Sequence, residues 1–71
     1  MAGKNWHGLT ARERQVLRAA WAGLTVPDIA VTLQINRRTA ETHMANIRRK
    51  SGSRNISQVL RWGLARGILK P

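Results

Sequence analysis

Basic side chains are concentrated in one short stretch of this 71-residue sequence, between residues 37 and 54. Six of the 13 Lys and Arg residues lie there, and Glu41 is the only acidic residue among them. The six are Arg37, Arg38, Arg48, Arg49, Lys50 and Arg54. A surface that neutralises phosphates releases counterions and thereby gains affinity for nucleic acid. The stretch therefore predicts a polyanion as the partner.

The same stretch has the pattern of a helix with two different faces. Residues 37–50 contain neither Gly nor Pro, which allows a helix of about four turns. At about 100° per residue, one side carries Ala40, His43, Met44 and Ile47. The other side carries Arg38, Thr42, Ala45 and Arg49, flanked by Glu41 and Asn46. A small, polar and basic stripe suits a surface that enters a groove, with basic ends on phosphates. The alternative, a solvated charged face, is disfavoured by the net charge of +10.

Three further helices must position this one. The predicted helices cover about residues 10–22, 26–33, 37–50 and 55–66. Their start signals are Thr10 with Glu13, Thr25 with Asp28, Asn36, and Asn55 or Ser57. The short turn between the second and third helices makes a helix-turn-helix candidate, and no strand pattern is present. The sequence predicts a compact all-α, four-helix domain over residues 9–71, preceded by a flexible lead-in over residues 1–8.

Length and composition exclude several classes of protein. With no Cys and 8.0 kDa, the chain has neither disulfides nor a Cys-based zinc site, so apolar packing must supply its stability. Three carboxylates and two histidines are a poor supply of general acids and bases, which predicts that the protein is not an enzyme. We expect no cofactor, no bound metal and no small-molecule substrate.

The sequence also has no apolar run of the roughly 20 residues that a membrane span needs. No hydrophobic signal segment precedes Leu9. We therefore expect a cytoplasmic protein that does not act at a membrane.

His43, Trp62 and Gly63 need separate interpretation. His43, on the inward side, is expected to be a packed, hydrogen-bonded histidine and not a metal ligand. Trp62 lies off the apolar stripe of the last helix, so it is either a subunit contact or a side chain folded over its own domain. Gly63 lacks a side chain there, which would permit close approach of another helix.

Over nearly all of its predicted domain the sequence resembles the LuxR/FixJ/NarL/GerE type of helix-turn-helix domain of bacterial transcription regulators. The matching segments are Leu9 to Leu17 (LTARERQVL), Gly23 to Thr25, Ile29-Ala30, Leu33, Thr39 to Ile47 (TAETHMANI), Arg49-Lys50, Gly52 and Gly67-Ile68. Each piece alone is weak, but their order and spacing together are specific.

The resemblance implies sequence-specific binding to double-stranded DNA as a transcription regulator. The third helix would enter the major groove, and the last helix would pair two copies as a homodimer. The residues implied to face bases are Glu41, Thr42, Ala45, Asn46 and Arg49. The residues implied to contact the DNA backbone are Thr25, Arg37, Arg38, Thr39, Arg48 and Lys50. Arg61, Trp62 and Ala65, off the apolar stripe of the last helix, are the expected dimer contacts.

Three alternatives remain beside this interpretation, one for the role of Glu41 and two for the class of protein. Glu41 could form an intrahelical ion pair with Arg37 or Arg38 instead of accepting a hydrogen bond from a base. The protein could also be a small basic protein associated with RNA or the ribosome, although the absence of Phe and Tyr leaves no evident stacking surface. The third alternative is a cationic membrane-surface peptide. The four capped helices argue against it, because they predict a cooperative fold in buffer.

Overall fold

The computed structural model describes residues 7–71, and that part of the chain contains four helices and no strand. The helices are α1 (Ala11–Trp21), α2 (Val26–Leu33), α3 (Arg37–Ser51) and α4 (Ile56–Ala65). Each end lies within one residue of the sequence expectation, and the all-α class is confirmed. Of the predicted lead-in over residues 1–8, residues 1–6 lie outside the described residues. None of the described helices has the length and apolar character to cross a membrane.

Side-chain caps fix where the helices begin, because the first amides of a helix have no partner within it. The Thr10 hydroxyl accepts from the Glu13 amide at 3.1 Å, and Glu13 Oε1 accepts from the Thr10 amide at 3.0 Å. Asn36 Oδ1 accepts from the Thr39 amide at 2.7 Å, which starts α3. At α4 the cap is Asn55, not Ser57, the other candidate from the sequence.

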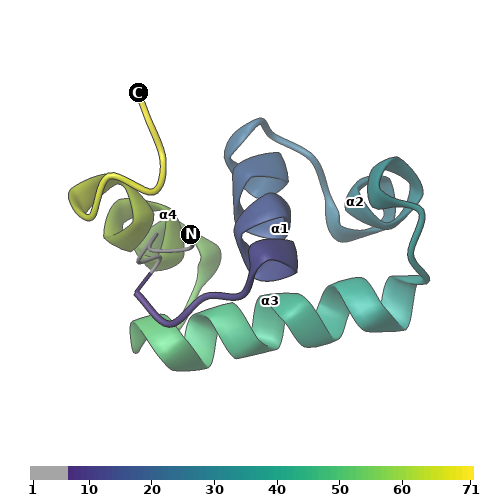
Figure 1. The fold of residues 1–71 in the computed structure, drawn as a ribbon, viewed down its shortest axis with the longest axis horizontal. Coiled ribbons are helices and arrows are strands. Elements are labelled where there is room, and N and C mark those ends of the chain that lie inside the picture. Colours follow the sequence, from purple (N-terminus) through teal and green to yellow (C-terminus); the bar gives the residue numbers. More distant parts are fainter. Residues whose placement is uncertain (1–6) are drawn as a thin grey trace.

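The helices are arranged around α1 and α3 (Figure 1). α3 runs along one edge of the molecule, and α1 stands across it with its first turn nearest to α3. α2 lies beyond one end of that crossing and α4 beyond the other. Both α1 and α2 pack against α3, so α3 is held from one side along most of its length.

The core is apolar and is shared by all four helices. Its buried members are Leu9, Val16, Leu17, Ile29, Ala30, Ala40, Met44, Ile47, Val59, Ile68 and Leu69. Glu13 is the one buried charged residue among those described, with 3% of its surface exposed. A buried charge needs a partner, and this one is described with the site below.

The segment after α4 folds back into the core. The backbone amides of Ile68 and Leu69 donate to the Gly63 carbonyl at 3.0 and 3.2 Å. A methyl group on Gly63 would lie 2.8 Å from Leu69 Cδ1 and 3.3 Å from Leu17 Cδ2. The missing methyl therefore admits Leu17 of another helix, α1, as expected, and it also admits Leu69 of the chain's own C-terminal segment, which the sequence did not indicate.

Candidate nucleic-acid interface

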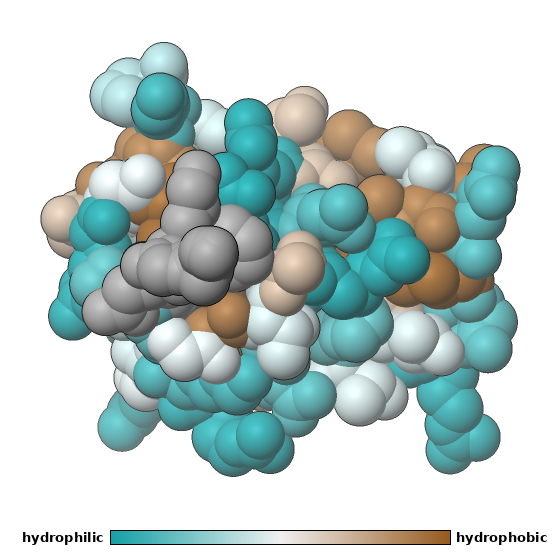
Figure 2. Space-filling view, viewed as in Figure 1, coloured by the Kyte–Doolittle hydropathy of each residue, from teal (hydrophilic) through white to brown (hydrophobic). Residues whose placement is uncertain are grey.

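The two faces of α3 differ as the sequence pattern predicts. Ala40, Met44 and Ile47 are buried against the other helices. The residues predicted to face bases lie on the remaining surface, where Glu41, Thr42, Ala45 and Arg49 are exposed and Asn46 is half-buried. Figure 2 shows the edge formed by α3 as largely hydrophilic, whereas hydrophobic side chains reach the surface near α2. The exposed face of α3 is thus polar, convex and open to a ligand.

The residues predicted to contact the DNA backbone surround this face but differ in exposure and in the partners they already have. Arg37 and Arg38 at the start of α3 are exposed, whereas Thr39 and Arg48 are half-buried. Thr25 at the start of α2 is exposed. Its hydroxyl and amide both donate to Asp28 Oδ2, at 2.9 and 3.4 Å. The sixth predicted contact, Lys50, lies in a separate interaction.

A tight turn sets α2 and α3 at a fixed relation to each other. Gln34 ends α2 in the left-handed conformation, with φ 59°. The Ile35 amide then donates back to the Ala30 carbonyl at 2.9 Å, and Asn36 caps α3. Ile35 packs against the core. This is the helix-turn-helix geometry that the sequence predicts, in which α2 supports the helix that presents the polar face.

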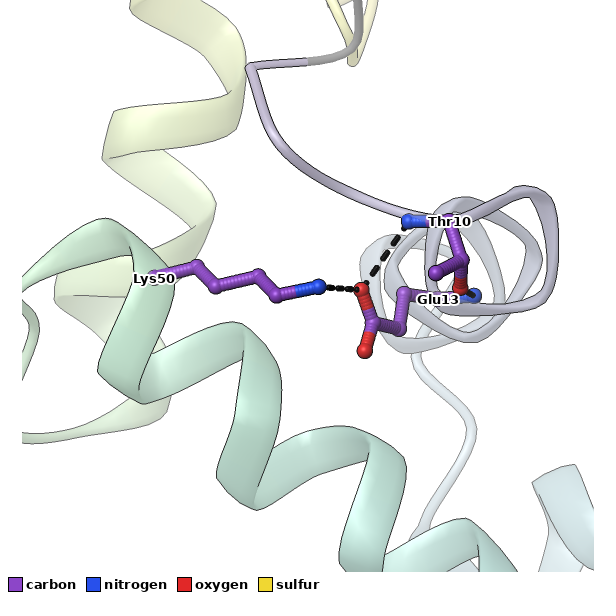
Figure 3. Close-up of polar contacts among 3 residues, drawn as sticks. All are labelled: Thr10, Glu13 and Lys50. Carbon is purple, nitrogen blue, oxygen red and sulfur yellow. Dashed lines mark hydrogen bonds and ion pairs between the residues drawn. The ribbon is translucent and has the colours of Figure 1, made fainter.

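The Lys50 side chain reaches across to the start of α1 (Figure 3). Its Nζ lies 2.7 Å from Glu13 Oε1, the same oxygen that accepts from the Thr10 amide. The Lys50 side chain is 27% exposed and the Glu13 side chain 4%. One carboxylate therefore caps α1 and binds the end of α3, which joins the two helices. Lys50, which the sequence assigns to phosphate contact, thus already uses one of its three N–H donors within its own domain.

The surroundings of Glu13 determine its ionisation. Burial acts to raise the pKa of Glu13, but the hydrogen bonds from Lys50 and the Thr10 amide outweigh it, with a further contribution from the charges of Lys50 and His43. The net result is a pKa below the ordinary 4.5. The carboxylate is therefore charged at neutral pH, as the ion pair requires.

Glu41 forms the intrahelical pair that the sequence left open. Its Oε2 lies 3.3 Å from Arg37 Nε, and both side chains are more than half exposed. Exposed pairs of this spacing contribute about 0.3–0.5 kcal/mol, so DNA phosphates or bases could displace either partner at little cost. The pair therefore holds Glu41 in place without removing it from the accessible face.

His43 lies inward and half-buried, as predicted, but one part of the prediction is wrong. Its Nδ1 is buried and has no hydrogen-bond partner, although a hydrogen-bonded histidine was expected. No group of three His, Cys, Asp or Glu side chains suited to a metal occurs between residues 7 and 71.

The predicted dimer residues on α4 do not form a uniform exposed patch. Arg61 and Ala65 are exposed, but Trp62 is half-buried and packs against the core. The Arg66 guanidinium lies 5.2 Å from the centre of the Trp62 ring system, and the His7 ring meets it edge-on at 6.1 Å. Trp62 therefore folds over its own domain, which was one of the two readings of the sequence.

Two contacts that organise the molecule escaped the sequence reasoning. Lys50 and Glu13 lie 37 residues apart, and Trp21 Nε1 donates to the Lys70 carbonyl, 49 residues away, at 2.8 Å. Neither pair has a local spacing that announces it. For the Lys50–Glu13 pair, the available signal was the position of Glu13 on the inward face of α1, because a carboxylate buried in a core needs a cation.

Comparisons with known proteins agree with this geometry. Residues 7–63 match the family described as bacterial regulatory proteins, luxR family. The chain is 44% identical over 60 residues to the transcriptional regulatory protein FixJ of Rhizobium meliloti, covering 84% of this chain and 29% of that protein. It is 40% identical over 63 residues to the transcriptional activator protein YukR of Yersinia ruckeri, covering 89% and 28%. The chain thus spans less than a third of these relatives.

The solved structure of the transcription factor GerE superposes with a TM-score of 0.83 at 31% sequence identity. The match covers 87% of this chain and 92% of that one. The family match spans α1, α2, α3 and most of α4, so it includes the helix-turn-helix of α2 and α3. The chain belongs to the luxR family of bacterial regulatory proteins, as a helix-turn-helix DNA-binding domain of transcription regulators.

Proposed function

We propose that this domain binds double-stranded DNA in a sequence-specific way, with the exposed face of α3 in the major groove. The observation that carries the proposal is the division of α3 into a buried side and a polar, basic side. Thr42 and Ala45 at the centre of the exposed side are small enough for a close approach to base edges, and their methyl groups can pack on thymine. Relatives named as transcriptional regulators and activators support a role in transcription. A cytoplasmic location is part of the proposal.

The basic residues divide into readers and anchors. Arg49 is exposed beside Thr42 and Ala45 and can reach a base or a phosphate. In this proposal Arg37 and Arg38, exposed at the other end of α3, contact phosphate. Arg48 also contacts phosphate, although its side chain is half-buried. Lys50 takes a different role in this proposal: it positions the end of α3 through Glu13.

Pairing of two copies through α4 is the second part of the proposal. Arg61 and Ala65 are exposed on the same helix and can form a small contact. Trp62 is the third dimer residue in this proposal: it packs on its own domain and supports the surface that Arg61 and Ala65 form. A contact of this size suits a dimer that forms on DNA, where each half-site holds one copy. An Ala65→Glu variant that binds a single half-site normally but loses cooperative binding to paired sites would support it.

Selection of bound duplexes from a random library tests the DNA proposal directly. We expect a recurring half-site, and a fixed spacing between half-sites if the copies pair. Thr42→Ala should change the preferred base at one position, and affinity should fall steeply with salt. Binding that ignores sequence, and that Thr42→Ala leaves unchanged, would contradict major-groove reading by α3. Preference for structured RNA over duplex DNA in direct competition would contradict the choice of partner.

A further inference from the structure

A second basic site lies on α1 and the segment that follows α4. A pocket of about 290 Å³ opens there, lined by Arg14, Arg18, Trp21 and Lys70 together with residues 67–69. Three cations and an indole thus share one hollow. None of the three acidic residues of the sequence lines it, so the pocket carries an excess of positive charge.

The pocket lies away from the face proposed to bind DNA. α1 meets α3 through its first turn, where Glu13 binds Lys50, and Trp21 is the last residue of α1. Trp21 follows Glu13 by eight positions along the helix, which is a rise of about 12 Å. In Figure 1 the last turn of α1 and the C-terminus both point away from α3. A straight duplex lying along the outer face of α3 therefore does not reach this pocket.

The walls of the pocket are fixed by contacts within the domain. Ile68 and Leu69 are buried in the core, which anchors the C-terminal segment. Trp21 Nε1 donates to the Lys70 carbonyl at 2.8 Å, which sets the indole against that segment. Arg14 and Arg18 are four residues apart and so lie on one side of α1. The indole and the C-terminal segment are thus held in place, and Arg18 and Lys70 are exposed beside them.

We propose that this pocket binds an acidic segment of a partner protein. Carboxylates of the segment pair with Arg18 and Lys70, and guanidinium groups bind carboxylates through two parallel hydrogen bonds. An adjacent apolar side chain of the segment packs on Trp21, which is 40% exposed. Charge complementarity selects an acidic partner, and the indole wall favours a polypeptide because a phosphate chain offers nothing apolar at that point. The proposal does not depend on DNA reading by α3.

Binding of a fluorescein-labelled peptide of alternating Glu and Leu, followed by anisotropy, tests this site. A Gln-Leu peptide of equal length is the uncharged control. Arg18→Glu is compared with Arg12→Glu, since both residues are exposed on α1 and both changes alter the charge equally, but Arg12 does not line the pocket. We expect Arg18→Glu to weaken binding of the acidic peptide at least about tenfold, because it places like charges together. Arg12→Glu should weaken it by no more than about twofold.

Two further readouts locate the site. The indole N–H resonance of Trp21 should shift on adding the peptide, while that of Trp62 stays in place. Duplex affinity of Arg18→Glu should equal that of Arg12→Glu, which separates this proposal from the DNA proposal. Equal losses of peptide binding in the two variants would overturn the proposal, since they would indicate general attraction to a basic surface. It would also be overturned if pyrophosphate displaced the peptide at low concentration, or if Arg18→Glu selectively weakened duplex binding.

Discussion

The two ends of α3 carry ion pairs of different character. At its start, Arg37 and Glu41 meet at 3.3 Å with side chains 67% and 55% exposed. At its end, Lys50 and Glu13 meet at 2.7 Å with side chains 27% and 4% exposed. Water screens the first pair and makes it worth little. The second removes a carboxylate from water, so losing either partner leaves a charge without compensation.

This difference separates residues that can bind DNA from residues that hold the helix for binding. A basic side chain within a cluster is available to phosphate only if its own domain does not occupy it. Arg37 can exchange Glu41 for phosphate at small cost, whereas Lys50 would have to leave a buried carboxylate. The charge of the cluster is therefore divided between recognition and architecture.

The largest expected effect comes from removing the buried carboxylate. Glu13→Gln should lower the free energy of unfolding by about 2–3 kcal/mol, since it leaves the Lys50 ammonium half-buried without its counter-charge; partial exposure keeps the loss below that of a fully buried pair. Urea denaturation followed by far-UV circular dichroism measures this. Glu41→Gln is the matched control and should change stability by less than about 0.5 kcal/mol. Equal losses in the two variants would remove the distinction between the two pairs.

Neighbouring cations at the end of α3 give the next effect. Arg49→Ala should weaken duplex binding by about 1–2 kcal/mol, because Arg49 is exposed on the reading face. Lys50→Met should weaken it less when both variants are measured well below their unfolding temperatures, since its ammonium group already binds Glu13. Fluorescence anisotropy with a labelled duplex gives both constants. If folded Lys50→Met loses more affinity than Arg49→Ala, Lys50 contacts phosphate directly and the distinction between the two residues is wrong.

Acid should weaken the domain through the same carboxylate. The pKa of Glu13 is lower in the folded protein than its ordinary 4.5, so the unfolded chain binds the proton more readily. The stabilisation is therefore complete above the ordinary pKa and is lost as pH falls through the lower, folded value. Unfolding measured across this acidic range should show a steeper decline for the natural sequence than for Glu13→Gln. Parallel curves would mean that Glu13 is not the residue responsible.

The smallest effect is expected at the exposed pair. Glu41→Gln should change duplex affinity by less than about 0.5 kcal/mol if Glu41 only pairs with Arg37. If Glu41 instead accepts a hydrogen bond from cytosine, the same variant should alter the preferred base at one position. Comparing selected sites for the two proteins distinguishes these roles.

Much of the fold is readable from local patterns. The capping box of Thr10 and Glu13, the Asn36 cap and the glycines after α1 and α3 set helix ends within one residue of those observed. The spacing of Ala40, Met44 and Ile47 identified the buried side of α3 and hence its exposed side. These features depend on neighbours within about one helical turn, so sequence spacing determines them.

Contacts between distant segments were not readable in the same way. Glu13 could be assigned to its cap, but the same oxygen also binds Lys50, and only packing brings α1 onto the end of α3. The sequence left two readings of Trp62 open, and only the fold brings Arg66 and His7 to its ring. The missing methyl of Gly63 indicated a close helix, which is α1 through Leu17, but nothing in the sequence indicated that Leu69 would also pack there.

The sequence by itself determined the helices, the amphipathic pattern of α3, the concentration of positive charge and the resemblance to a family. Each of these is a property of spacing or composition along the chain. The tertiary structure alone decided which of those charges remain accessible: Lys50 is held by Glu13, Arg37 is loosely paired, and Arg18 and Lys70 meet in a pocket with Trp21. The physical reason is that the availability of a charged group depends on its solvation and its partners, and both are fixed by side chains that the fold brings from elsewhere in the chain.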